Sequence, residues 1–338
     1  MIRITLMEPE KFVIDEVPDP EIEPGEALIR VKSNGICGGD VAPYVGKKLD
    51  IFPLPSVLGH EFGGIVEDIK GNAGEVRIGD KVAVYPALPC GNCYYCTRGM
   101  GFACNNMRFY GVGGTDGGFA EMFKAPIDNC VVLDKEFELT NIGIIEPATV
   151  ALKAIGEFVN STLAIYGVGS IGMLMIQIAK SNNNKIVAID IDQKHLETAR
   201  LIGADLVVDA NDASKNAIIR KYLDSERDEI DAIILTVCSQ EVLDWAINNV
   251  RKVGTIKNIT VMDSVGLSVN FNQVWTKQLT ISGQDCYTQE QFRKAARLVE
   301  EGIIKKEGVI TKYFPLAEVE EAFKYRVNEN ALKVILTG

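Results

Sequence analysis

The chain is predicted to combine two architectures: an irregular β-barrel and an α/β unit built on a parallel sheet. Residues 1 to about 145 are rich in glycine and proline and contain short β-type runs separated by turn signals. From about Ser161 onward, near-continuous apolar runs alternate with helical patterns, which is typical of a parallel sheet covered on both faces. After about Gln284 the tail is expected to return to the first domain. A chain of 338 residues can hold two such domains.

Each element is predicted from its local pattern. In the N-terminal part, residues 27–32 and 64–69 are β-type runs, bounded by turns such as Glu23-Pro-Gly25. The strands predicted in the second half are 163–166, 185–190, 205–209, 231–235 and 254–260, and the first two helices there are 171–180 and 194–202. Amphipathic helices at 289–301 and 316–326 precede a last strand at 333–336.

Composition restricts the function classes. Apolar residues make up 47% and charged residues 24%, as in ordinary globular domains. The net charge of −11 disfavours a nucleic-acid partner, because such surfaces are basic. We find neither a signal-peptide pattern at the start nor an apolar run of about 18 residues. We therefore expect a cytoplasmic protein with no membrane partner, whose eight cysteines do not form disulfides. Five of them fall in metal motifs, and Cys130, Cys238 and Cys286 are expected to be buried small apolar residues.

One loop carries a four-cysteine motif. Cys90-Gly-Asn-Cys93-Tyr-Tyr-Cys96, closed by Cys104, can surround one zinc ion tetrahedrally. Such a site has no open position for a substrate. The motif therefore predicts a structural zinc that holds a loop.

A glycine-rich turn follows the strand predicted at 163–166. In Gly167-Val-Gly169-Ser-Ile-Gly172, the first glycine permits a tight turn, the second lets the backbone approach a pyrophosphate, and the third allows close helix packing. The N-terminus of the following helix offers N–H groups to phosphates. The predicted cofactor-binding residues are Gly167, Gly169, Ser170, Ile171, Gly172 and Asp190.

Asp190 ends the next predicted strand and favours NAD over NADP. Its carboxylate can accept hydrogen bonds from the adenosine ribose hydroxyls and would repel a 2′-phosphate. Ile191 and Asp192 follow, with no arginine to bind that phosphate. His195 is a further candidate for contact with the ribose or pyrophosphate, although a solvated helix-start histidine fits the pattern as well.

A second metal site is predicted from residues far apart in the sequence. Cys37 and the pair His60 and Glu61 supply a thiolate, an imidazole and a carboxylate, and Glu146 adds another carboxylate. Three such ligands leave a fourth zinc position for water or substrate, as in catalytic sites. Asp40 is a candidate acceptor for the other ring nitrogen of His60.

Taken together, these motifs resemble the zinc-dependent medium-chain alcohol dehydrogenase family over essentially the whole chain. The residues that carry the resemblance are Gly35-Ile-Cys37-Gly-Gly-Asp40, Gly59-His-Glu61, the lobe of Cys90, Cys93, Cys96 and Cys104, Asp116-Gly-Gly-Phe-Ala-Glu121, Gly167-x-Gly169-x-x-Gly172 and Asp190. Within the family, Glu146-Pro-Ala-Thr-Val-Ala-Leu-Lys153 resembles the sorbitol and polyol dehydrogenase branch.

The resemblance implies a specific organisation. Residues 1–147 and 286–338 would form a zinc-binding catalytic domain with a chaperonin-10-like β-barrel, and residues 148–285 an NAD-binding Rossmann domain, with a cleft between them. Each subunit would hold one catalytic and one structural Zn²⁺ and would assemble into a dimer or tetramer. Cys37 and His60 would bind the catalytic zinc, and Glu61 or Glu146 would complete its ligand set directly or through water.

The chain also departs from the family pattern. The family usually has Ser or Thr after the Cys-Gly pair and often His three residues later, but this chain has Gly39 and Ala42. Neither can relay a proton, so we expect the proton to leave through water and Glu146 or Glu61. A smaller departure is Lys70, where glycine is usual.

The resemblance to the polyol branch implies oxidation of a secondary hydroxyl of a polyol, sugar alcohol, sugar phosphate or related compound to a ketone. Two alternatives remain open at this stage. One is a zinc dehydrogenase for L-threonine or a simple secondary alcohol or diol. The other is a zinc-stabilised, nucleotide-binding scaffold without catalysis, which the missing proton relay favours and the full set of site residues opposes.

Overall fold

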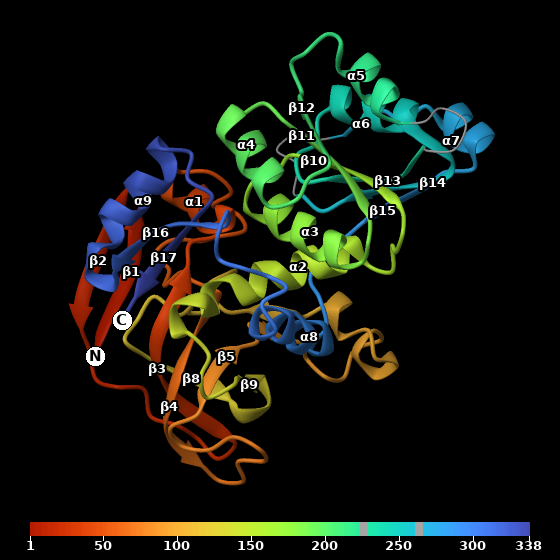
Figure 1. Ribbon diagram of the computed structural model, residues 1–338. Helices are drawn as coiled ribbons and strands as arrows, with labels where there is room; N and C mark the ends of the chain where they lie inside the picture. Colours follow the sequence, from red (N-terminus) through yellow and green to blue (C-terminus); the bar gives the residue numbers. More distant parts are fainter. Residues whose placement is uncertain (224–228, 261–265) are drawn as a thin grey trace. The chain divides into compact units, whose positions relative to one another are not determined.

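The computed structural model describes residues 1–223, 229–260 and 266–338. The chain divides into two compact units (Figure 1). Unit 1 comprises Met1–Thr149, Cys286–Gly302 and Val309–Gly338, and unit 2 comprises Val150–Asp285 and Ile303–Gly308.

Unit 1 is built on a seven-stranded mixed sheet. Its strand order is β16-β17-β3-β4-β5-β9, with β8 paired to β3. The strands are β3 (Glu26–Gly35), β4 (Glu61–Lys70), β5 (Lys81–Val84), β8 (Met122–Pro126), β9 (Cys130–Val132), β16 (Ile310–Pro315) and β17 (Lys333–Thr337). Two small antiparallel pairs are β1 (Ile2–Glu8) with β2 (Lys11–Glu16) and β6 (Ala87–Leu88) with β7 (Arg108–Phe109).

Few helices accompany this sheet. They are α1 (Gly38–Tyr44), α8 (Gln289–Glu300), α9 (Val319–Asn328) and the start of α2 (Ile145–Ile155), with 3₁₀ turns at Cys96–Arg98, Gly101–Ala103, Ile127–Asn129, Leu139–Ile144 and Leu316–Glu318. In the core, the rings of Phe12, Tyr44 and Phe323 stack and tilt against one another, joining β2, α1 and α9. A second core, around Phe62 and Phe123, lies under β3, β4 and β8.

The register of unit 1 fixes where polar side chains meet. Gly35, the last residue of β3, pairs with Glu61, the first residue of β4. On the other side, Gly35 pairs with Ile335 of β17. The end of one strand, the start of the next and the C-terminal strand therefore converge at one place, immediately before Cys37.

Unit 2 is a parallel six-stranded sheet with helices on its faces. The strand order is β12-β11-β10-β13-β14-β15. The strands are β10 (Thr162–Tyr166), β11 (Lys185–Asp190), β12 (Leu206–Asp209), β13 (Ile230–Leu235), β14 (Val250–Asn258) and β15 (Thr280–Gly283). The helices are α3 (Ser170–Ser181), α4 (Gln193–Leu201), α5 (Lys215–Tyr222), α6 (Gln240–Asn249) and α7 (Phe271–Lys277).

The inner strands β10, β11 and β13 of unit 2 are largely buried, as the sequence predicts. Every residue of β10 is buried, and β10 lies between β11 and β13, so the strand order reverses direction there. Ligands of open α/β sheets bind at the carboxyl ends of strands at such a reversal. Boundaries differ slightly from the predicted ones: β14 begins at Val250, and the predicted helix 316–326 consists of a 3₁₀ turn followed by α9.

No helix in the described part of the chain combines the length and the apolar character that a bilayer crossing requires.

Candidate active site and metal centres

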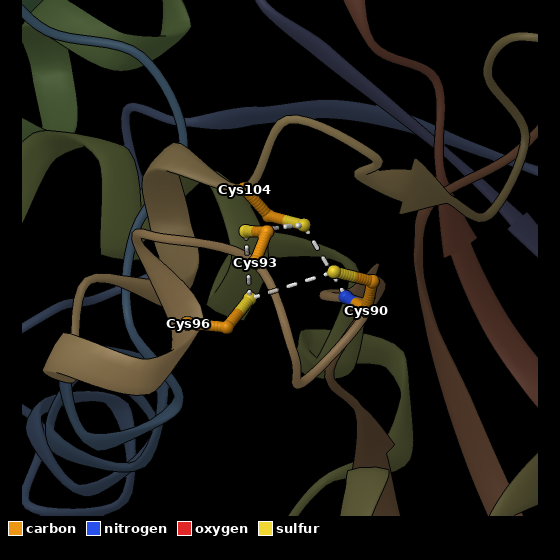
Figure 2. Close-up of side chains that lie close together, drawn as sticks. All are labelled: Cys90, Cys93, Cys96 and Cys104. Atoms are coloured by element: carbon orange, nitrogen blue, oxygen red, sulfur yellow. Dashed lines mark hydrogen bonds between the residues drawn. The ribbon is translucent and has the colours of Figure 1, made fainter.

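Four cysteine thiols gather in the lobe between β6 and β7 (Figure 2). The sulfur of Cys93 lies 3.5 Å from that of Cys96 and 3.8 Å from that of Cys104, and Cys90 and Cys96 lie 4.0 Å apart. Four thiolates around one zinc at about 2.3 Å would place their sulfurs about 3.8 Å apart in a regular tetrahedron. The four sulfurs therefore fit a closed four-thiolate zinc site.

Backbone N–H groups in this lobe lower the pKa of Cys90 and Cys93 and so favour their thiolate forms, whereas burial and the neighbouring thiols raise the pKa of Cys96. The N–H groups of Cys90 and Asn106 each donate to Cys104 Sγ at 3.3 Å. The N–H groups of Cys96 and Asn105 lower the pKa of Cys93 to about 6. Zinc binds the thiolate rather than the thiol, so the lobe is prepared for a cation by its own backbone.

Cys37 begins the second cluster and is positioned by α1. It is the N-cap of this helix, and its Sγ accepts from the N–H of Gly39 at 3.3 Å. Asp40 closes the capping box by accepting from the N–H of Cys37 at 2.9 Å. The cap fixes the thiol at the point where β3 ends.

His60 is buried and is oriented by Asp40. Gly59 has φ +95°, a conformation that favours glycine, and its N–H lies 3.4 Å from Asp40 Oδ1. The same oxygen lies 3.6 Å from His60 Nδ1, which has no hydrogen-bond partner within the described residues. Burial lowers the pKa of His60, but the charges of Asp40 and Cys37 outweigh it and hold the pKa well above its usual range. A cation bound to Nε2 of His60 would be stabilised by the same negative charges of Asp40 and Cys37.

Glu61 reaches the cluster from the first position of β4 and is paired with a lysine. Lys333 Nζ lies 2.7 Å from each carboxylate oxygen of Glu61 and 3.3 Å from the carbonyl oxygen of Ile36. Both side chains are almost fully buried, at 3% and 1% exposure. A Cβ at Gly35 would overlap the carboxylate, so the glycine leaves the space that Glu61 occupies.

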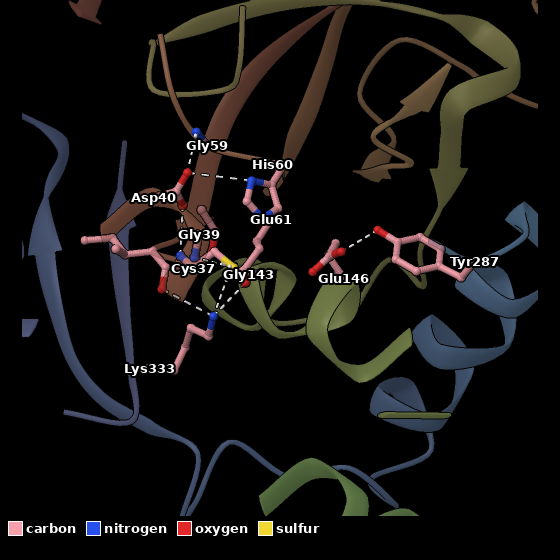
Figure 3. A network of polar contacts seen from close by, with 12 residues as sticks. Cys37, Gly39, Asp40, Gly59, His60, Glu61, Gly143, Glu146, Tyr287 and Lys333 are labelled. Atoms are coloured by element: carbon pink, nitrogen blue, oxygen red, sulfur yellow. Dashed lines mark hydrogen bonds and ion pairs between the residues drawn. The ribbon is translucent and has the colours of Figure 1, made fainter. Parts of the chain in front are cut away.

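Glu146, in the first turn of α2, is buried beside an aromatic cluster (Figure 3). The hydroxyl of Tyr287 donates to its Oε1 at 2.5 Å, and Tyr85 donates to the carbonyl of Tyr287 at 2.8 Å. Burial raises the pKa of Glu146 to about 7, against the opposing effect of the His60 charge and the Tyr287 hydrogen bond. Glu146 is thus a carboxylate that can change protonation near neutral pH.

The structure brings three of the four predicted residues together within metal-binding distance. Donor atoms of Cys37, His60 and Glu61 all lie within 4.8 Å of one another, and Glu146 is not part of that group. Figure 3 shows Lys333 directed at Glu61, and Glu146 facing Tyr287. A thiol, an imidazole and a carboxylate at this spacing fit a zinc ion with three protein ligands.

The glycine turn after β10 fits a pyrophosphate. Gly167 has φ +91°, and a Cβ there would overlap Thr236 Oγ1, while a Cβ at Gly172 would lie 2.6 Å from the carbonyl oxygen of Gly167. At Gly169, the N-cap of α3, nothing lies within 4 Å of a Cβ position, and no side chain caps the helix. The space beside Gly169 is therefore open at the start of a helix, where phosphate binds favourably.

Asp190 lies at the carboxyl end of β11, next to this turn. Its carboxylate accepts from the N–H groups of Val168 at 2.6 Å and Asp192 at 3.0 Å, and His195 Nδ1 lies 3.7 Å away. Burial raises the pKa of Asp190, but these hydrogen bonds and His195 lower it below its usual value. Asp190 stays ionised, as a group that must accept from ribose hydroxyls and repel a 2′-phosphate.

The comparisons with known proteins agree with this geometry. Residues 23–135 match the alcohol dehydrogenase GroES-like domain family, and residues 170–301 match the zinc-binding dehydrogenase family. L-Threonine 3-dehydrogenase of Bacillus subtilis (strain 168) is 30% identical over 334 residues, covering 96% of this chain and 94% of that protein. The chain belongs to the zinc-dependent alcohol dehydrogenase family.

Polyol dehydrogenases are also among its relatives. Sorbitol dehydrogenase of Bacillus subtilis (strain 168) is 25% identical, covering 96% of this chain and 93% of that protein. The crystal structure of galactitol-1-phosphate dehydrogenase from Escherichia coli has a TM-score of 0.91 at 25% identity, covering 100% of both chains. The predicted resemblance and fold class are confirmed. This dehydrogenase is an NAD-dependent oxidoreductase of the zinc-binding type.

Two residues of the site were missed from the sequence. Lys333 and Tyr287 meet Glu61 and Glu146 across 272 and 141 residues of chain. For Lys333 a signal existed, because a lysine at the start of an otherwise apolar strand, Lys333-Val-Ile-Leu336, is unusual in a core. For Tyr287 the sequence offers no comparable signal.

Proposed function

We propose that this dehydrogenase oxidises a secondary hydroxyl of a polyhydroxy substrate, such as a polyol, sugar alcohol or sugar phosphate, to a ketone. The observation that carries the proposal is the group of the half-buried Cys37 and the buried His60 and Glu61 in unit 1, with Glu146 and its tyrosine partner nearby. Unit 1 would do the chemistry, and unit 2 would bind NAD through the turn at Gly167 and through Asp190.

The chemistry is shared between the bound groups and the chain. When bound, zinc supplies a Lewis acid that acidifies a hydroxyl, and NAD supplies the hydride acceptor. Cys37, His60 and either Glu61 or Glu146 would hold the metal. Asp40 orients the His60 ring. Glu61 is paired with Lys333 and Glu146 with Tyr287, so the relative strength of these two contacts decides which carboxylate binds the metal.

The residues of this chain favour a carboxylate as the proton acceptor. Gly39 and Ala42 have no group that can carry a proton. Glu146 combines burial, a raised pKa of about 7 and a donor hydroxyl from Tyr287, which stabilises the ionised form when the proton has left. We therefore assign the acceptor role to Glu146, with the water that would lie between it and the substrate.

The relatives support two substrate classes. Proteins named for sorbitol and galactitol 1-phosphate favour a polyol or its phosphate ester. L-Threonine is the second candidate, because a relative named for it is 30% identical. A non-catalytic scaffold is disfavoured, since the donor atoms of a metal site with mixed ligands are assembled and buried.

The test is NADH formation by zinc-loaded enzyme with hexitols, hexitol phosphates, sugar acids, cyclitols, L-threonine and butanediol. We expect the highest kcat/KM with one polyhydroxy class. A higher value with L-threonine or butanediol would replace the substrate and keep the enzyme class. No turnover with any of them, although zinc and NAD are bound, would contradict the proposal.

We also propose that the enzyme acts in the cytoplasm as a homodimer or homotetramer. None of the eight cysteines forms a disulfide, as expected in a reducing compartment. The strand β15 lies at the edge of the sheet in unit 2, and Phe271 and Trp275 of the neighbouring α7 are 74% and 76% exposed. Exposed aromatic side chains beside an open sheet edge favour pairing with a second copy. Sedimentation of the wild type and of Trp275→Lys tests this, and a monomeric wild type would contradict it.

A further inference from the structure

A cavity of about 650 Å³ lies within unit 1, and none of the candidate metal ligands lines it. Its walls come from β1, the segment that follows β2, the start of β3, β8, and the β6–β7 pair with the loop after it. A cavity of this volume has the size of a small-molecule binding site. The cavity is therefore separate from the candidate metal site.

The wall of this cavity is mostly apolar. Val57, Tyr110, Met122 and Phe123 line it, and all four are buried. Small-molecule sites are lined mainly by such residues, with a few polar groups that fix the orientation of the ligand. The wall therefore favours a ligand with an apolar body.

Two arginines are among the polar residues of the wall. Arg3 lies in β1, where alternate residues face opposite sides, and its neighbours Ile2 and Ile4 pack in the apolar core. The Nε of Arg3 is buried and makes no hydrogen bond within the described residues. Arg108, the first residue of β7, is exposed, so the cavity can be reached from solvent.

Neither guanidinium is engaged by the protein. No hydrogen bond or ion pair joins the side chain of Arg3 or Arg108 to any residue that the structure describes. The terminal nitrogens of both side chains are therefore available to a ligand in the cavity that they line. A half-buried cation such as Arg3 is costly without a partner, so an anion in the cavity would stabilise it.

The other charges of the wall are largely balanced. Lys124 lies 3.4 Å from Glu26, and the amino group of Met1 lies 3.2 Å from Asp19. Asp116 is the remaining carboxylate of the wall, against two unpaired guanidiniums. This excess of positive charge favours an anion, although the whole chain has a net charge of −11, because the local charges set the potential in the cavity.

We propose that this cavity binds a small amphipathic anion, with an apolar body and one carboxylate or phosphate head. The head would accept from the guanidiniums of Arg3 and Arg108, whose planar, paired N–H donors match both kinds of oxyanion. The body would lie against Val57, Tyr110 and the residues of β8. The proposal adds a second ligand site to the enzyme and does not depend on which hydroxyl compound is oxidised.

Arg108 and the candidate metal site lie on opposite sides of one short strand. Phe109, the next residue of β7, contacts the ring of His60, with centroids 5.7 Å apart. Successive residues of a strand point to opposite faces, so Arg108 faces away from His60. A ligand at Arg108 and a substrate at the metal site can therefore be bound at the same time.

Calorimetric titration of the zinc-loaded enzyme tests the site with octanoate, octanamide and acetate as probes. Octanamide has the apolar body without the charge, and acetate has the charge with almost no body. We expect one octanoate per chain, with a Kd at least about tenfold lower than for the other two probes. Equal binding of octanoate and octanamide would overturn the proposal, as would the absence of octanoate binding.

Two variants change the cavity in different ways. Arg108→Gln removes one donor to the head and should raise the Kd of octanoate by about 10- to 100-fold, the range of a charge-assisted hydrogen bond. Val17→Trp keeps both arginines but fills the cavity, and it should abolish binding. An unchanged affinity for octanoate in both variants would contradict the site.

Arg297→Gln is the matched control. It removes an exposed arginine of α8, in the same unit, that does not line the cavity, and it should leave the Kd unchanged. The Tm and zinc content of every preparation should match the wild type, which separates loss of the site from loss of the fold. Because these measurements need no turnover, their outcome is independent of whether a polyol is oxidised.

Crystals soaked in 8-bromooctanoate locate the ligand through the anomalous signal of bromine. We expect bromine in the cavity and the carboxylate next to Arg3 and Arg108. A carboxylate can also bind a catalytic zinc. Density only at the Cys37 site would assign the binding of octanoate to the metal and overturn the proposal.

Discussion

The Cys90 lobe and the Cys37 site each gather donor atoms for a metal, but their surroundings differ. In the lobe, one short segment supplies four equivalent thiols, and backbone N–H groups are the donors to sulfur. In the Cys37 site, the candidate metal ligands lie on different segments of the chain and are a thiol, an imidazole and a carboxylate. They lie among ionisable side chains.

This difference separates a closed site from a reactive one. Four thiolates satisfy zinc completely and leave nothing to titrate. Around Cys37, by contrast, Asp40, Lys333 and Tyr287 each pair with a different member of the site. Such neighbours tune the affinity and acidity of a metal site. We therefore expect the lobe to stabilise the fold and the Cys37 site to do the chemistry.

The strongest test of this contrast is His60→Ala. Loss of a metal ligand should lower kcat by about 10³-fold or more, because the Lewis acid is lost or misplaced. The lobe should keep its zinc. His195→Ala removes the other histidine of the chain; because His195 lies 3.7 Å from Asp190, this variant should change the KM for NAD rather than kcat. Turnover within tenfold of wild type in His60→Ala would contradict the assignment.

Lys333→Met removes the lysine of the buried ion pair with Glu61, a feature that the Cys37 site has and the Cys90 lobe does not. It leaves the buried Glu61 without its lysine partner, which should lower the free energy of unfolding of metal-free protein by about 3–5 kcal/mol. Lys124→Met is the matched control: its ion pair with Glu26, at 3.4 Å, is much more exposed and should contribute at most about 1 kcal/mol. Urea denaturation measures both. Equal losses for the two variants would show that the buried pair has no special role.

Glu146 and Tyr287 predict a pH dependence for catalysis. A proton acceptor works only when deprotonated, and burial raises the pKa of Glu146 to about 7, so kcat should rise with pH through about 7. Tyr287→Phe removes a hydrogen bond that lowers this pKa and should move the rise to higher pH. Glu146→Gln should remove the rise and lower kcat by about 10²-fold.

The control for this profile is Tyr85→Phe, which removes a neighbouring hydroxyl that donates to the Tyr287 carbonyl rather than to Glu146. Its profile should match the wild type. Four superimposable profiles would remove Glu146 from the proton path.

Cys96→Ser should have the smallest effect on chemistry. Disrupting the lobe should lower Tm by about 5–10 °C, because the metal holds the loop folded. The ratio of kcat/KM values between two substrates should stay within about twofold of wild type. A changed ratio at unchanged Tm would mean that the lobe contributes to specificity.

The sequence predicts local features of this molecule better than distant contacts. The lobe and the glycine turn could be found because their residues lie close together in the sequence. In the first the thiols bind zinc, and in the second the glycines permit a tight turn and close approach of a phosphate. For the cluster of Cys37 with His60, the residue types predicted a metal site, but spacing alone could not show that its members meet, since they do so through the pairing of β3 with β4. The contacts of Lys333 and Tyr287 could not be predicted: the apolar strand marks Lys333 as unusual, but spacing carries no information about contacts across 272 and 141 residues.

The most direct test of the two-site account is the zinc content of the wild type, His60→Ala and Cys96→Ser, measured by mass spectrometry on preparations of known turnover. We predict two zinc ions per wild-type chain and one in each variant. Turnover should be lost in His60→Ala and kept in folded Cys96→Ser. A wild type with a single zinc, or a folded Cys96→Ser that has lost turnover and kept its other zinc, would contradict the division between a structural and a catalytic metal.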